Sequence, residues 1–205
     1  MKPDTSQTAT KHSELLAFLG NSLLLPMNQT ERLGLQPSFW EWASEGESET
    51  VRRAAERCAS VSAELLASEG SEDAAMHRAS VEYTKLFIGP PKPAAPPWET
   101  YYLAGDCVTG FGEPTFDVRQ VMADHGIISN GPHHQLEDHM GIELLVLSQL
   151  CNGGNLQDAV SFAEAHPCSW IDKLTEAVDA QDVSGYYGSL LRLAKAVMLD
   201  MIASR

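Results

Sequence analysis

One short segment interrupts an otherwise helical pattern: five of the nine residues from Gly89 to Pro97 are proline. Each proline lacks a backbone N–H and fixes φ, so this segment cannot be an α-helix or an interior strand. We expect a stiff, polyproline-like connector over residues 89–97 that joins two helical groups, residues 13–88 and 98–205.

On both sides of this connector, apolar residues recur every three or four positions, which is the spacing of one helix face. The clearest case runs from Val51 to Leu65 and follows Ser48, a good helix-capping residue. Ser71 and Asp138 occupy similar capping positions further along the chain. No stretch shows the sustained period-two alternation of a strand. The pattern predicts an all-α fold, a single compact bundle of about eight to ten helices.

The chain has 205 residues and a formal net charge of −14. This length is sufficient for one hydrophobic core without disulfides or a metal ion, so we expect a single domain over residues 13–205. The polar start, residues 1–12, is expected to be disordered. Because the surface is acidic and has no lysine or arginine cluster, it would repel a phosphate backbone, and nucleic acid is excluded as a partner.

Targeting signals and cysteine motifs are also missing from the sequence. No apolar run approaches the roughly 20 residues that span a bilayer, and the first residues lack the apolar core of a secretory signal. The four cysteines form no CxxC pair, which argues against a zinc ribbon or a thioredoxin-like motif. We expect a soluble, cytoplasmic protein with reduced thiols and no membrane span.

Histidines and carboxylates are concentrated around one predicted helix start: His133, His134, Glu137, Asp138, His139 and Glu143. If the helix begins near Asp138, His139 and Glu143 share a face and can approach one ligand. Imidazole and carboxylate groups also bind zinc, iron or manganese, although this spacing matches no familiar zinc motif. Three interpretations stay open: a metal-dependent hydrolase using His133, His134, Asp138 and His139, a capped polar helix start, or a partner-binding surface.

A second constellation directly follows the prolines: Trp98, Glu99, Tyr101 and Tyr102. Aromatic rings and a carboxylate suit a groove that binds an extended peptide containing arginine. The same rings can instead dock the connector on the core. The sequence lacks a GxSxG motif and a phosphate-binding loop, which argues against nucleophilic catalysis and nucleotide binding. Apart from the hydrolase alternative, we expect a protein that binds a partner, uses no cofactor and is not an enzyme.

In this order and separation, the two constellations resemble the TorD/DmsD family, cytoplasmic maturation chaperones of molybdenum oxidoreductases. The resemblance rests on Glu82-Tyr83-Thr84-Lys85-Leu86-Phe87-Ile88-Gly89-Pro90, Ala95-Pro96-Pro97-Trp98-Glu99-Thr100-Tyr101-Tyr102, Phe111-Gly112-Glu113-Pro114-Thr115 with Val118-Arg119, residues 137–144, and Phe162-x-Glu164-x-His166 with Trp170. Thr100 stands where this family commonly has serine, and the N-terminal third is similar only as generic helices.

The resemblance implies an all-helical chaperone, a monomer or a homodimer that includes a domain-swapped form. Its implied partners are the catalytic-subunit precursor of a DMSO/TMAO reductase type enzyme and the twin-arginine signal peptide of that precursor. It assigns binding roles to Trp98, Glu99, Asp138 and His139, and a groove-shaping role to Gly89, Pro90 and Pro97. On this basis we expect the leader arginines to meet Glu99, Asp138 or Glu143, and the apolar part to lie against Trp98 and Tyr102.

Overall fold

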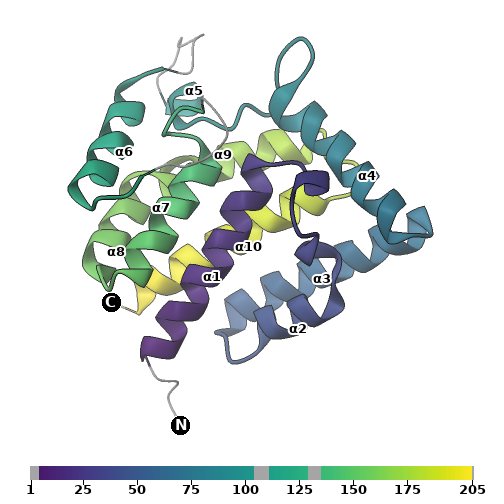
Figure 1. Cartoon of the computed structure of the whole chain (residues 1–205), viewed down its shortest axis with the longest axis horizontal. Coiled ribbons are helices and arrows are strands. Elements are labelled where there is room, and N and C mark those ends of the chain that lie inside the picture. Colours follow the sequence, from purple (N-terminus) through teal and green to yellow (C-terminus); the bar gives the residue numbers. More distant parts are fainter. Residues whose placement is uncertain (1–4, 104–110, 129–134, 205) are drawn as a thin grey trace.

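The computed structural model describes residues 5–103, 111–128 and 135–204. Within these ranges the chain forms ten α-helices and no strand, which confirms the predicted all-α bundle (Figure 1). None of the described helices is both long and apolar enough to cross a lipid bilayer. The helices are α1 (Thr5–Leu24), α2 (Pro37–Ser44), α3 (Glu49–Glu69), α4 (Glu72–Tyr83), α5 (Glu99–Leu103), α6 (Glu113–Asp124), α7 (Met140–Asn152), α8 (Leu156–Ala165), α9 (Pro167–Asp179) and α10 (Tyr186–Ala203).

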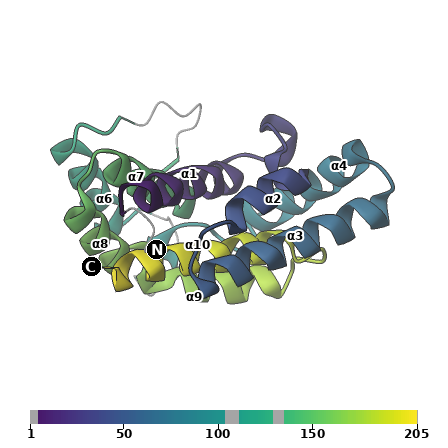
Figure 2. The same ribbon diagram turned by 90° about the horizontal axis from the view of Figure 1, so that it is seen from below.

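Helices from the two sides of the proline-rich segment share one core. α1 packs chiefly against α7, and α10, near the C-terminus, packs chiefly against α3. In both views α1 and α10 run through the middle of the molecule, with α2, α3 and α4 to one side and α6, α7 and α8 to the other (Figures 1 and 2). The residues on either side of the connector therefore depend on each other for burial of their apolar faces.

Two glycines allow α1 to approach the first turn of α7 closely. A Cβ atom built on Gly20 would lie 2.7 Å from the carbonyl oxygen of Gly141, and one on Gly141 would lie 2.7 Å from that of Gly20. Such distances are too short for real carbon atoms, so larger residues would force the helices apart. This contact holds the N-terminal end of α7, which carries part of the site described below.

The first helix begins earlier than the sequence suggested. α1 starts at Thr5, before the domain start that the sequence suggested at residue 13. Lys11 and His12 give the physical reason, because both contact the carboxylate of Glu47: the Lys11 Nζ–Glu47 Oε1 distance is 3.3 Å and the His12 Nε2–Glu47 Oε2 distance is 3.1 Å. These contacts hold the early turns of the helix against the loop before α3.

Two helix starts agree with the predicted caps. The Ser48 hydroxyl accepts a hydrogen bond from the Val51 N–H at the start of α3, and the Ser71 hydroxyl accepts one from the Ala74 N–H at 3.2 Å at the start of α4. These caps satisfy backbone N–H groups that have no partner within the helix.

The proline-rich segment is a compact loop, so the expected stiff connector is wrong in shape. α4 continues into the π-helical turn η3 (Thr84–Ile88), after which the chain reverses. The Ala94 N–H then donates to the Lys85 carbonyl at 3.2 Å, and the Ala95 N–H donates to the Leu86 carbonyl at 2.8 Å. Both alanines lie between prolines but keep their backbone N–H groups. Their two hydrogen bonds hold the loop against the end of the preceding helix.

Gly89 makes this reversal possible. Its φ is +100°, a value that side-chain-bearing residues rarely adopt. A Cβ on Gly89 would also lie 2.7 to 2.8 Å from backbone atoms of Lys92. The glycine is therefore required both for its dihedral angle and for the close approach of the loop.

Candidate functional site

Two segments that are distant in the sequence meet beside the proline-rich loop. Trp98 and His139 form an isolated antiparallel β-bridge, and the Glu99 N–H donates to the Asp138 carbonyl at 2.9 Å. The ring of Trp98 also meets the ring of His139 edge-on, with 5.8 Å between centroids. The structure thus places the two constellations of the sequence side by side.

The carboxylate of Asp138 ties this junction together from inside. It is fully buried and accepts hydrogen bonds from the Thr100 N–H at 3.0 Å, from the Thr100 hydroxyl at 2.6 Å and from the Thr115 hydroxyl at 3.0 Å. The predicted cap at Asp138 is therefore wrong: the N-cap of α7 is His139, whose Nδ1 accepts from the Gly141 N–H at 3.0 Å. Asp138 instead connects α5, α6 and the start of α7.

A second group of buried polar residues, which we call the His166 cluster, consists of Glu99, Glu143 and His166. His166 Nδ1 lies 2.9 Å from Glu99 Oε2, and the hydroxyl of Ser169 lies 3.5 Å from Glu99 Oε1. The indole N–H of Trp170 donates to Glu143 Oε2 at 3.0 Å. One ligand-type atom from each of the three residues in the cluster lies within 4.8 Å of the others.

The His166 cluster carries negative charge that no nearby lysine or arginine compensates. In the part of the chain that the structure describes, His166 is the only basic side chain in an ion pair with Glu99 or Glu143. Burial raises the pKa of Glu143 well above its ordinary value, and the negative charge of Glu99 raises it further. The arrangement therefore favours either a proton or another cation between the two carboxyl groups.

The aromatic side chains Trp98 and Tyr102 are half-buried at this site. Tyr102 stacks on Trp170, with ring centroids 5.5 Å apart and planes inclined by 24°. Three buried side-chain atoms of the described residues have no hydrogen-bond partner: Trp98 Nε1, Tyr102 Oη and Glu143 Oε1. Native proteins contain few such atoms, and each calls for a structural or functional reason. All three belong to residues that the sequence singled out for peptide binding.

The three loop residues predicted to shape the groove, Gly89, Pro90 and Pro97, lie in two separate parts of the structure. Pro97 is buried directly before Trp98. Gly89 and Pro90, in contrast, line a hollow of about 740 Å³ together with Val81 and Ile88. This hollow does not include Trp98, so the structure does not bring all predicted binding residues into one groove.

Two further features of the structure were not predicted as parts of a site from the sequence. His166 and Trp170 lie inside the late sequence block, but only the tertiary structure pairs them with Glu99 and Glu143. A hollow of about 810 Å³ lies against α1, α7 and the end of α6, and its lining mixes apolar and amide side chains, among them Leu24, Met122, Ile142, Leu145, Asn21 and Gln149. Helical spacing marks these apolar residues as core, so no sequence signal indicated a hollow.

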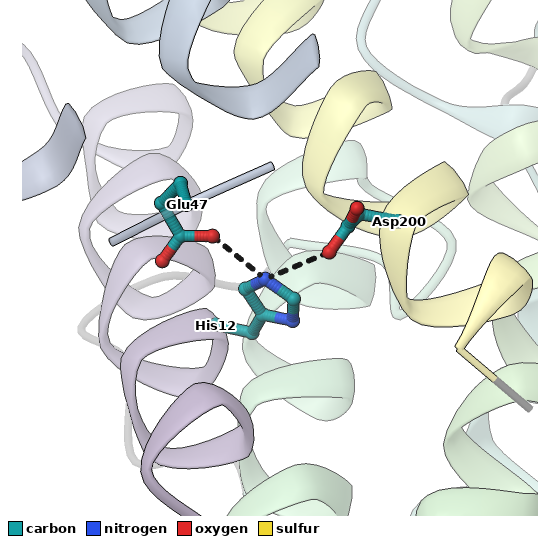
Figure 3. A group of neighbouring side chains, drawn as sticks. All are labelled: His12, Glu47 and Asp200. Carbon is teal, nitrogen blue, oxygen red and sulfur yellow. Dashed lines mark hydrogen bonds and ion pairs between the residues drawn. The ribbon is translucent and has the colours of Figure 1, made fainter. Parts of the chain in front are cut away.

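The residues of the hydrolase alternative are only partly described. His133 and His134 lie outside the described residues. Asp138 and His139 do not occur in either described group of three side chains with metal-ligand spacing. The first of these groups is the His166 cluster. The second, which we call the His12 cluster, consists of His12, Glu47 and Asp200 (Figure 3).

Comparison with known proteins decides the family. Residues 45–176 match the nitrate reductase delta subunit family. The chain belongs to this family. The match covers more than half of the sequence and includes both constellations and the Asp138 junction.

Curated relatives confirm the resemblance to TorD/DmsD. The chain is 30% identical over 113 residues to "Probable Tat proofreading chaperone DmsD" of Haemophilus influenzae, covering 55% of this chain and 54% of that protein. It is 25% identical over 136 residues to "Chaperone protein TorD" of Vibrio cholerae serotype O1, covering 61% and 60%. The aligned part thus spans little more than half the length of these relatives.

One solved structure shares the fold of this family member. It is the crystal structure of an Archaeoglobus fulgidus protein assigned to redox enzyme maturation, with a TM-score of 0.53 and 19% sequence identity. The alignment covers 90% of this chain and 91% of that one, so the similarity in fold extends over most of the chain.

Proposed function

We propose that this protein is a cytoplasmic, non-enzymatic chaperone for a molybdenum-containing oxidoreductase of the DMSO/TMAO reductase type. It binds the twin-arginine leader or the apo form of the enzyme precursor and holds it back from export until the cofactor is inserted. Family membership and the chaperone names of the curated relatives support this proposal. Binding and release need no covalent chemistry by the chaperone.

The observation that carries the proposal is the set of unpaired polar atoms at the junction. Trp98 Nε1 is a hydrogen-bond donor, Tyr102 Oη is a donor and an acceptor, and Glu143 Oε1 is an acceptor. An extended peptide offers carbonyl groups to the first two atoms, and an arginine offers N–H groups to the third. A leader peptide would therefore satisfy groups that the folded chain leaves without partners.

The described state is closed, and leader binding requires it to open at α5. Glu99, Asp138 and Glu143 are buried, so an arginine reaches them only when α5 moves aside. Opening would break the contact of Glu99 with His166, the bonds that Glu99 and Thr100 make to Asp138, the stacking of Tyr102 on Trp170, and a hydrogen bond from Lys173 Nζ to the Tyr102 carbonyl at 3.1 Å. The rings of Trp98 and Tyr102 would then receive the apolar part of the leader.

The other predicted residues shape this site in the proposal. His139 and Pro97 hold Trp98 in place through the β-bridge and the adjoining chain. Gly89 and Pro90 keep the loop folded against its helix, which sets the direction in which the chain enters Trp98.

The test is a titration of a synthetic twin-arginine leader into the purified protein, measured by calorimetry. Replacing Arg-Arg by Ala-Ala in the leader is expected to weaken binding roughly 5-fold to 150-fold, which corresponds to about 1 to 3 kcal/mol for a charge-assisted contact. Equal affinities for the two leaders would refute the arginine contact.

The matched control uses two neighbouring tyrosines. Tyr102→Phe removes an unpaired buried hydroxyl, whereas Tyr101→Phe removes one from a side chain that is 46% exposed. The proposal predicts weaker leader binding for Tyr102→Phe alone. If both variants bind as the wild type does, the hydroxyl of Tyr102 takes no part, and if neither leader nor precursor binds at all, the chaperone proposal itself fails.

A further inference from the structure

The His166 cluster joins three helices at one point. Glu99 comes from the start of α5, Glu143 from the first turn of α7, and His166 directly precedes α9. Their exposed fractions are 2%, 0% and 9%. Ligand atoms from all three side chains lie within 4.8 Å of one another, although the residues are far apart in the sequence.

Two observations indicate that the His166 cluster lacks a component. Glu143 Oε1 is completely buried and has no hydrogen-bond partner, and no lysine or arginine of the described residues forms an ion pair with Glu99 or Glu143. An isolated buried carboxylate is costly, and proteins compensate such charge by pairing it or by binding a metal ion. A cation between Glu99 and Glu143 would meet both needs.

The His12 cluster shows how this chain treats the same groups when the charge is balanced. His12 Nε2 lies between the carboxylates, 3.1 Å from Glu47 and 3.5 Å from Asp200 (Figure 3). Lys11 contacts the other oxygen of Glu47 at 3.3 Å, and Asp200 keeps 20% of its side chain exposed. Every carboxylate there has a basic partner or access to water, so an added cation would find no uncompensated charge.

We propose that Glu99, Glu143 and His166 bind one divalent transition-metal ion, with Zn²⁺ as the best fit, and that the ion links α5, α7 and α9. One imidazole and two carboxylates form an accepted zinc ligand set, and the +2 charge of the ion balances both carboxylates. Ligand atoms around one zinc ion lie about 3 to 3.5 Å apart, so rotations that move these atoms by about 1 to 2 Å complete the site. Ser169 or water supplies the fourth ligand.

This inference goes beyond leader binding and is tested separately from it. The ion would use carboxylates that the proposed function offers to a leader arginine, so the titration is done without a leader. Failure of the metal titration leaves the leader titration unaffected, and the reverse also holds.

The experiment measures Zn²⁺ binding to the full chain, purified without a histidine tag and stripped with EDTA, by calorimetry. Co²⁺ replaces Zn²⁺ in a second titration, because its visible absorption reports on the ligand geometry. We expect one ion per chain in the wild type. Glu143→Gln keeps the size of the side chain and its hydrogen bond from Trp170. Its affinity for Zn²⁺ should fall by at least about 100-fold, because changing only a residue that hydrogen-bonds to a metal ligand already costs up to about that much.

The matched control is Glu47→Gln in the His12 cluster, another buried glutamate beside a histidine. It should retain wild-type Zn²⁺ affinity, which separates the proposed site from surface histidines. His166→Gln provides a second variant and should also lose the ion, while circular dichroism checks that helix content is retained.

Several outcomes would overturn the proposal. Absence of stoichiometric Zn²⁺ binding by the stripped wild type would mean that a proton shared by the two carboxyl groups is the cation of the cluster. Unchanged affinity or an unchanged Co²⁺ spectrum in both Glu143→Gln and His166→Gln would place the ion elsewhere.

Discussion

The His12 cluster and the His166 cluster contain the same groups, one imidazole and two carboxylates, but their surroundings give them opposite properties. At Glu47, burial alone would raise the pKa, yet the hydrogen bond and charge of His12 and the charge of Lys11 outweigh it and lower the pKa below its ordinary value. At Glu143, burial and the charge of Glu99 both raise the pKa. The pKa of a buried glutamate in this fold is therefore lowered where cations lie beside it and raised where another carboxylate does.

Position in the bundle explains this difference. The His12 cluster lies where α1, the loop before α3 and α10 meet, and these elements supply Lys11 as well as His12 (Figure 3). The His166 cluster lies beneath α5, and its neighbours Trp170, Tyr102 and Asp138 supply no positive charge. The His12 cluster is a complete ion-pair network, whereas the proposed cation would complete the His166 cluster.

The largest expected effect is on the free energy of unfolding, when Glu47 and Glu143 are each replaced by glutamine. Glu47→Gln should destabilise the fold by about 3 kcal/mol, because it leaves Lys11 and His12 beside a neutral partner. Glu143→Gln in metal-free protein should leave stability unchanged or raise it, since a neutral amide suits that buried position. Urea unfolding at neutral pH measures both. A clear loss of stability in Glu143→Gln would mean that its carboxylate is already compensated.

The next effect concerns metal. At a free Zn²⁺ concentration 100 times the Kd, the wild type should gain about 2.7 kcal/mol in free energy of unfolding. Glu143→Gln should gain almost nothing under the same conditions, whereas Glu47→Gln should gain as much as the wild type. Thermal melting with Zn²⁺ and with EDTA measures this difference. Equal gains in stability for all three proteins would mean that Zn²⁺ binding depends on neither Glu143 nor Glu47.

Acid should act on the His12 cluster through Glu47. Because its pKa is lowered in the folded state, its stabilisation is complete above the unfolded value of about 4.5 and disappears as pH falls through the folded value. The stability difference between wild type and Glu47→Gln should therefore shrink from about 3 kcal/mol toward zero below that pH. Urea titrations between neutral pH and pH 3 measure it, and a constant difference would assign the stabilisation to packing.

The smallest effect should come from the outer carboxylate of the His12 cluster. Asp200 is 3.5 Å from His12 and partly exposed, so Asp200→Asn should cost only about 0.5 to 1 kcal/mol. Added salt should reduce this cost further, because water and ions already screen the pair. A cost as large as that of Glu47→Gln would place Asp200 at the centre of the network.

Features that depend on nearby residues could be predicted from the sequence alone. The caps at Ser48 and Ser71 were correct because a capping side chain bonds to an N–H three residues later. The apolar spacing predicted the helices for a similar reason, since one face of a helix is set by residues three and four apart. The blocks around Trp98 and Asp138 also indicated the family.

Tertiary structure alone decided the features that depend on distant residues. Asp138 looked like a cap, but its partners Thr100 and Thr115 are 38 and 23 residues away. The proline-rich loop looked extended, but Ala94 and Ala95 found carbonyl partners on the preceding helix end. The electrostatic surroundings of Glu47 and Glu143 could not be predicted in the same way. Both are glutamates near a predicted helix start, and only helix packing placed Lys11 and His12 beside Glu47 and the carboxylate of Glu99 beside Glu143. Helix formation is a local property of the chain, whereas the electrostatic environment of a buried carboxylate is set by which helices meet there.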